Sequence, residues 1–494
     1  PHAVRTGLGD GEVYYSNLLG KIVCLLANKA AAISVSGVGV EMEGGRPGWY
    51  DSINGIPALF GATTSEIFQL LRVTRQLTAW FAELGLPSNY VQRLPVEIFD
   101  LVRAVQQSLT DYLASDDPER DYIYWDAASN AKEHCRARTA RGFTGVEREI
   151  TVEEIRNFCQ TLEERIQASL PDAVDAETGL YATYITHTPL EWEDVLADGR
   201  PQLDDHGRTC VKVQRFARHN FPLFLEAPMH SLRLEEDPDA ARELWTAVRG
   251  SALYDKKLGM YLTNASIHDE SPELGRIHAW PAGWFENENV FMHLEYKYLL
   301  QMLRAGLYEE FFADVRQVLI PFQDMATFGR HPLENCSFIV SSHHPRPGYY
   351  GRGFQPRSSG TTAEWLNMMM IISFGERPFR YENGELLLRF TPKLPAWFFT
   401  AIEETGKRTT PEGEVVEHTF PAHSYSTLFL GHTLVTYHNP SGRACYGPNA
   451  VGVISYSLSY DDGYEVTVPG PELSADYAQA VRERRVREMV VELG

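Results

Sequence analysis

The sequence lacks the features that would mark a membrane-spanning, secreted or nucleic-acid-binding protein. It contains no run of about 20 apolar residues, the length that a transmembrane helix needs. Residues 1–12 are polar and glycine-rich, unlike a secretory signal. No cluster of Lys and Arg stands out, and 66 acidic against 45 basic residues give a formal net charge of −21. Because nucleic acid is bound through clustered cations, we expect neither nucleic acid nor a membrane as a partner.

Cysteine is also scarce, and its spacing excludes two further classes of protein. The six cysteines contain no C-x-x-C pair; they are Cys24, Cys135, Cys159, Cys210, Cys336 and Cys445. This pattern favours reduced thiols in a cytoplasmic protein over a disulfide framework or a zinc site. His331 and the pair His343–His344 match no standard metal-ligand spacing and have no adjacent acidic residue. We therefore predict no metal and no cofactor.

Helical periodicity dominates the chain from about residue 13 to residue 375. Apolar residues recur at the spacing i, i+3, i+4 and i+7, and residues 63–66 have the pattern of a capping box. Alternation of Tyr and Thr at 181–186 indicates one short hairpin. The expected helices cover residues 13–33, 63–81, 96–114, 152–170, 238–248, 290–303 and 308–319.

After Gly375 the pattern changes to short β-prone runs bounded by Gly, Pro, Asn and Asp. These runs are 385–390, 424–430, 432–437, 452–460 and 464–468. We predict two domains, a helical one over 1–378 and a β-rich one over 379–494. Serial helices joined by long loops favour a mainly α fold, part of an (α/α)6 toroid, followed by a small C-terminal β-sandwich domain.

Three segments carry candidate chemistry, and the first is the loop 46–55. Its two glycines and its proline predict a loop between helices. Trp49 could stack on a sugar face, while Asp51 and Asn54 could bind neighbouring hydroxyls. The alternative is an ordinary loop in which Asp51 caps backbone N–H groups and Trp49 fills the core, and spacing alone favours it.

The second segment places Glu286 seven residues before His293 (293 − 286 = 7), where turn chemistry gives way to helix. Groups seven apart within one helix share a face. The bulky neighbours Trp284 and Phe285 could desolvate Glu286 and raise its pKa, which suits an acid or a sugar ligand. Alternatively, Glu286 matches a helix dipole and His293 is a core histidine.

The third segment covers residues 352–364 and resembles an anion-binding helix start. We expect the helix to begin near Thr362, with Thr361 and Glu364 at capping-box spacing. Free N–H groups at such a start attract anions, Gly360 permits close approach, and Ser359 adds a hydroxyl. Arg352 or Arg357 could pair with the anion. An ordinary capped helix is the alternative reading.

Together the three segments resemble the inverting glycoside phosphorylases of glycoside hydrolase family 94, the cellobiose phosphorylase and 1,2-β-oligoglucan phosphorylase group. The resemblance covers residues 40–375 in family order. It implies that Glu286 binds sugar and that His293, Ser359 and Gly360 bind phosphate, with Ser359 where relatives often have Thr. It also implies substrate contacts from Trp49, Asp51 and Gln355. The β-rich end is similar to the family's small C-terminal sandwich.

One departure concerns the catalytic acid that the resemblance implies. That acid is an Asp in a loop well upstream of the Trp-Asp loop, whereas only 50 residues precede Asp51 here. We therefore expect the general acid to be absent from this chain, with Asp51 as a substitute. The chain then corresponds to a C-terminal half. Its expected protein partners are an N-terminal half, on the same polypeptide or as a separate subunit, and a second copy in a homodimer.

The activity implied by the resemblance is phosphorolysis of a β-linked gluco-oligosaccharide to an α-sugar 1-phosphate. The expected partners are a β-glucan oligosaccharide and inorganic phosphate, the co-substrate. Phosphate is already an oxyanion, so this reaction needs no second carboxylate as base. Two alternatives stay open. One is an inverting hydrolase that uses Asp51 and Glu286, and the other is a non-catalytic carbohydrate-binding or structural half of a split enzyme.

Overall fold

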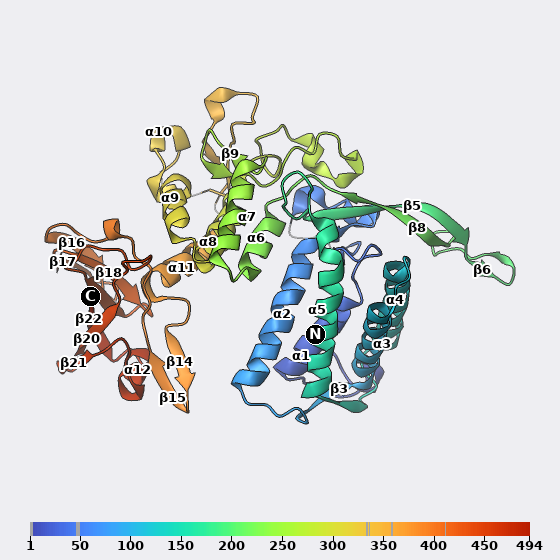
Figure 1. The fold of residues 1–494 in the computed structure, drawn as a ribbon, viewed down its shortest axis with the longest axis horizontal. Coiled ribbons are helices and arrows are strands. Elements are labelled where there is room, and N and C mark those ends of the chain that lie inside the picture. Colours follow the sequence, from blue (N-terminus) through green and yellow to red (C-terminus); the bar gives the residue numbers. More distant parts are fainter. Residues whose placement is uncertain (1–2, 46–49, 332–333, 335, 357–358, 411) are drawn as a thin grey trace. The chain divides into compact units, whose positions relative to one another are not determined.

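The computed structural model describes residues 3–45, 50–331, 334, 336–356, 359–410 and 412–494. The chain divides into two compact units, each discontinuous in sequence. The first comprises Pro1–Gln301 and Gln323–Pro356, and the second comprises Met302–Phe322 and Arg357–Gly494. Figure 1 labels the helices and strands of both units.

Five helices form the N-terminal part of the first unit (Figure 1). They are α1 (Leu18–Ala30), α2 (Thr64–Glu83), α3 (Val96–Ala114), α4 (Arg120–Thr139) and α5 (Val152–Ser169). Helix α2 packs against α5, and α3 packs against α1, α4 and α5. The predicted apolar stripe of α2, from Ile67 to Phe81, is buried in their shared core, so this helical prediction is confirmed.

The starts of these helices follow local capping chemistry. Helix α5 begins with a complete capping box, in which Thr151 and Glu154 bond each other's backbone N–H groups. At α2 the Thr63 hydroxyl instead accepts from the N–H of Ser65, at 3.2 Å. The predicted helix is therefore present. At its start Thr63 accepts from the N–H of Ser65, whereas a capping box would use the N–H of Glu66. Strands β3 (Val91–Pro95) and β4 (Glu147–Thr151) form a ribbon that leads into α3 and α5.

A four-stranded sheet of order β1-β2-β5-β8 adjoins this bundle within the first unit. Its strands are β1 (Val40–Glu41), β2 (Ala62–Thr63), β5 (Tyr184–Asp194) and β8 (Val211–Asn220). Beyond the sheet β5 and β8 continue as a long, largely exposed hairpin, with β6 (Leu196–Ala197) and β7 (Arg200–Pro201) near its tip (Figure 1). The hairpin predicted at 181–186 is thus the start of a much longer one.

The remainder of the first unit holds short elements joined by long loops. They are α6 (Glu226–Leu234), α7 (Pro238–Gly250), β9 (Tyr254–Asp255), β10 (Met260–Tyr261) and α10 (Met325–Phe328). A three-stranded sheet joins β11 (Val290–Phe291), β12 (Phe338–Ile339) and β13 (Gly353–Phe354). Helix α8 (Met292–Arg304) follows β11 directly. This small sheet therefore fixes the loop that precedes α8 to the segment around residue 340.

The second unit is built on a five-stranded sheet of order β18-β19-β22-β20-β21. The strands are β18 (Ser424–Phe429), β19 (Thr433–His438), β20 (Val453–Tyr460), β21 (Glu465–Pro469) and β22 (Val486–Leu493). Strands β19 and β22 are parallel, and the other neighbours are antiparallel. Two hairpins accompany it, β14 (Phe379–Glu382) with β15 (Glu385–Leu388) and β16 (Glu404–Thr409) with β17 (Val415–Phe420).

Three helices complete the second unit: α9 (Tyr308–Val318), α11 (Ser359–Phe374) and α12 (Ala475–Arg482). The C-terminal end of α11 is anchored to the sheet by Phe374, whose ring lies 4.6 Å from that of Phe429 and 5.0 Å from that of Phe390. The buried hydroxyl of Tyr437 donates to the carbonyl oxygen of Ser373. The opposite end of α11 carries Ser359 and Gly360.

The predicted mainly α fold with an (α/α)6 toroid portion is wrong. Helix makes up 40% of the chain and strand 24%, so strands are a major part of the fold. Many small sheets interrupt the helices, including β1-β2-β5-β8 and β11-β12-β13, and a five-stranded sheet lies at the C-terminus. The short strands were missed because a two-residue strand has no periodicity of its own. Such a strand forms only where a distant partner supplies its hydrogen bonds.

Candidate functional site

The structure brings the loop around Asp51 into direct contact with Glu286. The hydroxyl of Tyr50 donates to the carbonyl oxygen of Glu286 at 2.9 Å, and the N–H of Ser52 donates to its Oε2 at 2.9 Å. Residues Asp51–Ile53 form a short 3-10 turn, which aims the Ser52 N–H at this carboxylate. Two of the three predicted segments thus meet within the first unit, although they are more than 230 positions apart in sequence.

Two glycines allow the loop after Asp51 to lie directly on the segment 273–276. A Cβ atom at Gly55 would lie 1.9 Å from the carbonyl oxygen of Glu273, and one at Gly275 would lie 2.5 Å from that of Ser52. Gly275 also has a φ of +136°, which other residues rarely adopt. This close packing places the Arg276 guanidinium 3.2 Å from the Asp51 carboxylate.

The two carboxylates differ in environment. Asp51 is exposed, with 67% of its side chain accessible, whereas Glu286 is half-buried. Burial raises the pKa of the Glu286 carboxyl, and the negative charge of Asp51 raises it further. The hydrogen bond from Ser52 and the charge of Arg276 act in the opposite direction without cancelling the rise in pKa. Glu286 is therefore partly desolvated in the structure.

Tyr50 packs against a buried aromatic cluster. The ring of Phe224 contacts both Tyr50 and Tyr184 edge-on, with centroids 5.8 and 4.9 Å apart. The Tyr184 hydroxyl donates to the buried carboxylate of Glu226. Burial, followed by the nearby charges of Glu286 and Glu226, raises the pKa of Tyr50 well above its usual value. Tyr50 therefore stays a neutral hydrogen-bond donor, and it holds the backbone of Glu286 in place.

The backbone around Glu286 is strained. Phe285 and Glu288 have φ angles of +51° and +50°, values that non-glycine residues seldom adopt. The turn is secured by Asn287, whose side-chain amide donates to the carbonyl oxygen of Trp280 at 2.9 Å. Strain that the surrounding structure maintains is characteristic of binding and catalytic loops. The seven-residue spacing from Glu286 to His293 is not helical, because Glu286 lies in this turn and β11 separates it from α8.

The same loop is tied to the segment after β12 through a charged pair. The Nδ1 atom of His343 lies 2.8 Å from the Glu288 carboxylate. This contact with Glu288 raises the pKa of His343 above its usual value. The histidine therefore does have an acidic neighbour, contrary to the sequence-based expectation. Among the described residues no group of three or more His, Cys, Asp or Glu side chains is arranged to hold a metal ion.

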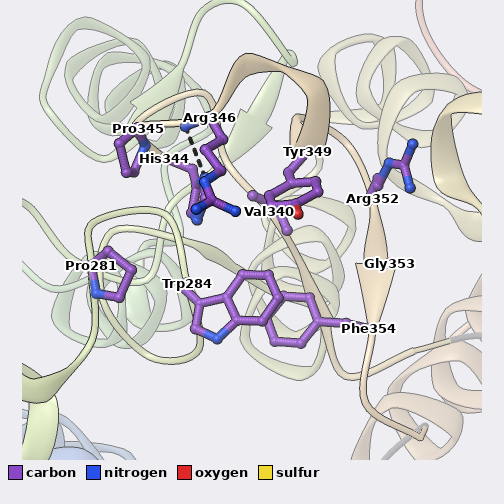
Figure 2. Close-up of a pocket in the computed structure, with 10 residues that line it drawn as sticks. All are labelled: Pro281, Trp284, Val340, His344, Pro345, Arg346, Tyr349, Arg352, Gly353 and Phe354. Carbon is purple, nitrogen blue, oxygen red and sulfur yellow. Dashed lines mark hydrogen bonds between the residues drawn. The ribbon is translucent and has the colours of Figure 1, made fainter.

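A cavity of about 690 Å3 opens beside this loop (Figure 2). Its floor is the indole of Trp284 stacked on the ring of Phe354, with centroids 4.1 Å apart and an interplanar angle of 5°. Its other polar or aromatic walls are His344, Arg346, Tyr349 and Arg352. A smaller cavity of about 350 Å3 lies on the Trp280 and Glu288 side of the loop. Asp51 and Glu286 are not among the described lining residues of either cavity.

The predicted phosphate-binding residues fall in different units. His293 is half-buried in the first turn of α8, in the first unit, with its ring 6.0 Å from that of Phe291. Ser359 and Gly360 open α11 in the second unit, and Ser359 is exposed. Helix α11 begins three residues before the expected start at Thr362, so Ser359 and Gly360 are in its first turn. The anion-attracting end of the helix therefore includes both predicted residues.

Of the remaining predicted ligands, the structure describes Gln355. Gln355 is exposed just after β13 and has a φ of +64°. Trp49 and Arg357 lie outside the described residues. Sequence reasoning missed Tyr50, Ser52 and Arg276 as partners of the two carboxylates.

The missed residues carry little signal of their own. Tyr50 and Ser52 had one, because both lie inside the loop 46–55 already singled out. Ser52 acts through its backbone N–H, and Arg276 acts through an ion pair that depends on the fold.

No protein-family model matches the chain, and the search of curated proteins finds no match either. No helix within the described ranges is long and apolar enough to cross a membrane. The resemblance to glycoside phosphorylases therefore rests on the residues themselves, and the function derived from it is a proposal.

Proposed function

We propose that this chain carries the sugar-binding part of an inverting β-glucoside phosphorylase. The single observation that supports this most is the contact of the Asp51 loop with Glu286 through Tyr50 and Ser52. This contact brings the loop with the exposed carboxylate of Asp51 against the strained loop with the half-buried carboxylate of Glu286. The six cysteines are all free thiols, in keeping with the proposed cytoplasmic location. The N-terminal half and the homodimer remain predictions.

The proposed chemistry uses Asp51 as the proton donor in place of an upstream acid. A protonated Asp51 transfers its proton to the glycosidic oxygen as the bond between that oxygen and the anomeric carbon breaks. An oxygen of hydrogen phosphate attacks the anomeric carbon from the opposite face. The products are a free hydroxyl on the leaving sugar, an α-sugar 1-phosphate and the ionised Asp51, so atoms and charges balance.

Glu286 has a different role in this proposal. One of its oxygens already accepts from the Ser52 N–H, and its backbone is fixed by Tyr50. A carboxylate held in this way can accept hydrogen bonds from sugar hydroxyls in a fixed geometry. The phosphate contacts implied by the resemblance are proposed for each unit by itself, namely His293 in the first unit and Ser359 with Gly360 in the second. The start of α11 supplies free N–H groups and a favourable dipole for an anion.

The proximity of Asp51 and Glu286 also supports an inverting hydrolase, which needs a paired acid and base. Incubation with 1,2-β-glucooligosaccharides or cellobiose, with and without phosphate, separates the two functions. The phosphorylase reading expects sugar 1-phosphate only when phosphate is present. Glucose release that is independent of phosphate would instead favour the hydrolase. No turnover together with measurable oligosaccharide binding would favour the non-catalytic reading.

A further inference from the structure

The cavity above the Trp284–Phe354 stack contains two hydrogen-bond donors that have no acceptor among the described residues. Arg346 forms no ion pair and no side-chain hydrogen bond with any described residue, although the chain has a net charge of −21. Its guanidinium carbon lies 5.9 Å from the centre of the Tyr349 ring. Acidic partners are abundant in this protein, so an unpaired guanidinium in the wall of a cavity is available for an anion from outside.

His344 supplies the second donor, and its tautomer follows from one contact. The backbone N–H of Arg346 donates to Nδ1 of His344 at 3.1 Å, so this nitrogen carries no proton. The neutral ring must therefore carry its proton on Nε2. That N–H has no partner among the described residues, even though only 7% of His344 is exposed and its ring lines the cavity. Because the ring lines the cavity, this N–H is open to an acceptor atom of a ligand or to water.

Flat rings surround these donors. The imidazole of His344 lies 5.7 Å from the Trp284 ring and 5.5 Å from the Tyr349 ring. In Figure 2 His344 and Arg346 face the Trp284–Phe354 stack across the cavity, whereas Arg352 points away from it. Gly283 makes the arrangement possible, since a Cβ atom there would lie 2.5 Å from the backbone nitrogen of His344. A volume of about 690 Å3 exceeds what a bare anion requires and is typical of small-molecule sites.

We propose that this cavity binds a sugar ring that carries an oxyanion, either a phosphate or a carboxylate. The ring lies on the Trp284–Phe354 stack, and the oxyanion accepts from Arg346 and from His344 Nε2. That the ring is a sugar rests on the proposed function, whereas the oxyanion rests on the two unused donors. The site differs from the proposed phosphate site, because neither His293 nor Ser359 lines the cavity.

Calorimetric titration of the full chain tests the proposal with four probes: glucose 6-phosphate, glucuronate, glucose and inorganic phosphate. We expect at least one of the two anionic sugars to bind about tenfold more tightly than glucose and than phosphate alone. Which of them binds distinguishes phosphate from carboxylate. Equal affinity for glucose and both anionic sugars would overturn the proposal, and so would phosphate binding that is as tight as that of the sugar phosphate and is lost in Arg346→Gln.

Variants locate the binding. Arg346→Gln should weaken binding of the anionic sugar about tenfold, and Arg346→Lys should weaken it less because the charge remains. Arg148→Gln is the matched control, since this exposed arginine of β4 loses the same charge far from the cavity and should bind as the unchanged protein does. Unchanged binding by Arg346→Gln contradicts the proposal. Phosphorolysis is assayed separately, so a lack of turnover with intact anionic-sugar binding counts against the proposed function alone.

Discussion

At the scale of single residues, Asp51 and Glu286 are distinguished by exposure and by their partners. Asp51 extends towards solvent beside Arg276, whereas Glu286 is half-buried and fixed by Tyr50 and Ser52. Exposure lets a proton donor reach the glycosidic oxygen, while a fixed carboxylate suits recognition of hydroxyl groups. The two side chains therefore respond differently to replacement.

Asp51→Asn should lower kcat for an oligosaccharide by about 10²- to 10⁴-fold, the usual contribution of a general acid. A β-glucosyl fluoride needs no protonation of its leaving group, so its phosphorolysis should be largely retained in this variant. Glu286→Gln is the control, because loss of a sugar contact should affect both substrates alike. Equal losses on both substrates for Asp51→Asn would remove this residue from the acid role.

The pair of His343 and Glu288 predicts a pH dependence of stability. The pKa of His343 is higher in the folded protein than in the unfolded chain, so folding favours the protonated imidazole. This contribution is complete below the unfolded value of about 6.5 and is lost as pH rises through the higher folded pKa. Besides Glu288, the charge of Asp255 acts in the same direction.

We therefore expect His343→Gln to lower the free energy of unfolding at pH 5.5 and to have less effect at pH 9. The effect should be small, because His343 is partly exposed. Urea unfolding at both pH values measures it, and the imidazole NMR signal reports the pKa directly. In Glu288→Gln that pKa should fall. A pKa that does not change would show that the 2.8 Å contact does not persist in solution.

At the scale of elements, helix α5 is anchored to α3 and α4 by a fully buried guanidinium. Arg165 is 0% exposed, pairs with Asp121 at 2.6 Å, and lies over the rings of Tyr112 and Tyr124 at 3.8 and 5.1 Å. Burial raises the pKa of Asp121, and the guanidinium only partly opposes this rise. The pair thus depends on both partners being present.

Arg165→Ala should destabilise the protein by about 3–5 kcal/mol, since it leaves Asp121 without its buried partner and removes the contact with the two rings. Arg103→Ala is the matched control on the same bundle. The ion pair of Arg103 with Glu154 is exposed, and its loss should cost at most about 1 kcal/mol. Urea unfolding of the two variants measures the difference, and equal losses would contradict this account of the bundle core.

At the scale of the whole molecule, two compact units predict unfolding in more than one step. The first unit has a helical core that runs from α1 to α5, and the second has a core around its five-stranded sheet. Domains with separate cores commonly depart from two-state behaviour. We expect differential scanning calorimetry to give a calorimetric enthalpy larger than the van't Hoff enthalpy.

The variant Arg165→Ala provides the control for this prediction. Its change lies within the first unit, so only the transition of that unit should move to lower temperature. A single transition with equal enthalpies, shifted as a whole by Arg165→Ala, would show instead that the chain unfolds as one cooperative unit.

Local patterns in the sequence determined most of the long helices and the C-terminal strands. The stripe from Ile67 to Phe81 lies on α2, the run 152–170 became α5, and the runs 424–430 and 432–437 became β18 and β19. Periodicity predicts these elements because each residue's burial depends on neighbours three, four or two positions away. The residue types in the loops around Asp51 and Glu286 also marked both loops as candidate binding segments.

Only the tertiary structure decided which of these elements meet. It brought the Ser52 N–H to the Glu286 carboxylate and placed strand β11 between Glu286 and His293. It also stacked Trp284 on Phe354, and the two rings form the floor of a cavity. It also replaced the expected toroid by helices interrupted with small sheets. Such contacts depend on how distant segments pack, as where Gly55 and Gly275 let two loops touch, and a local pattern contains no information about its distant partner.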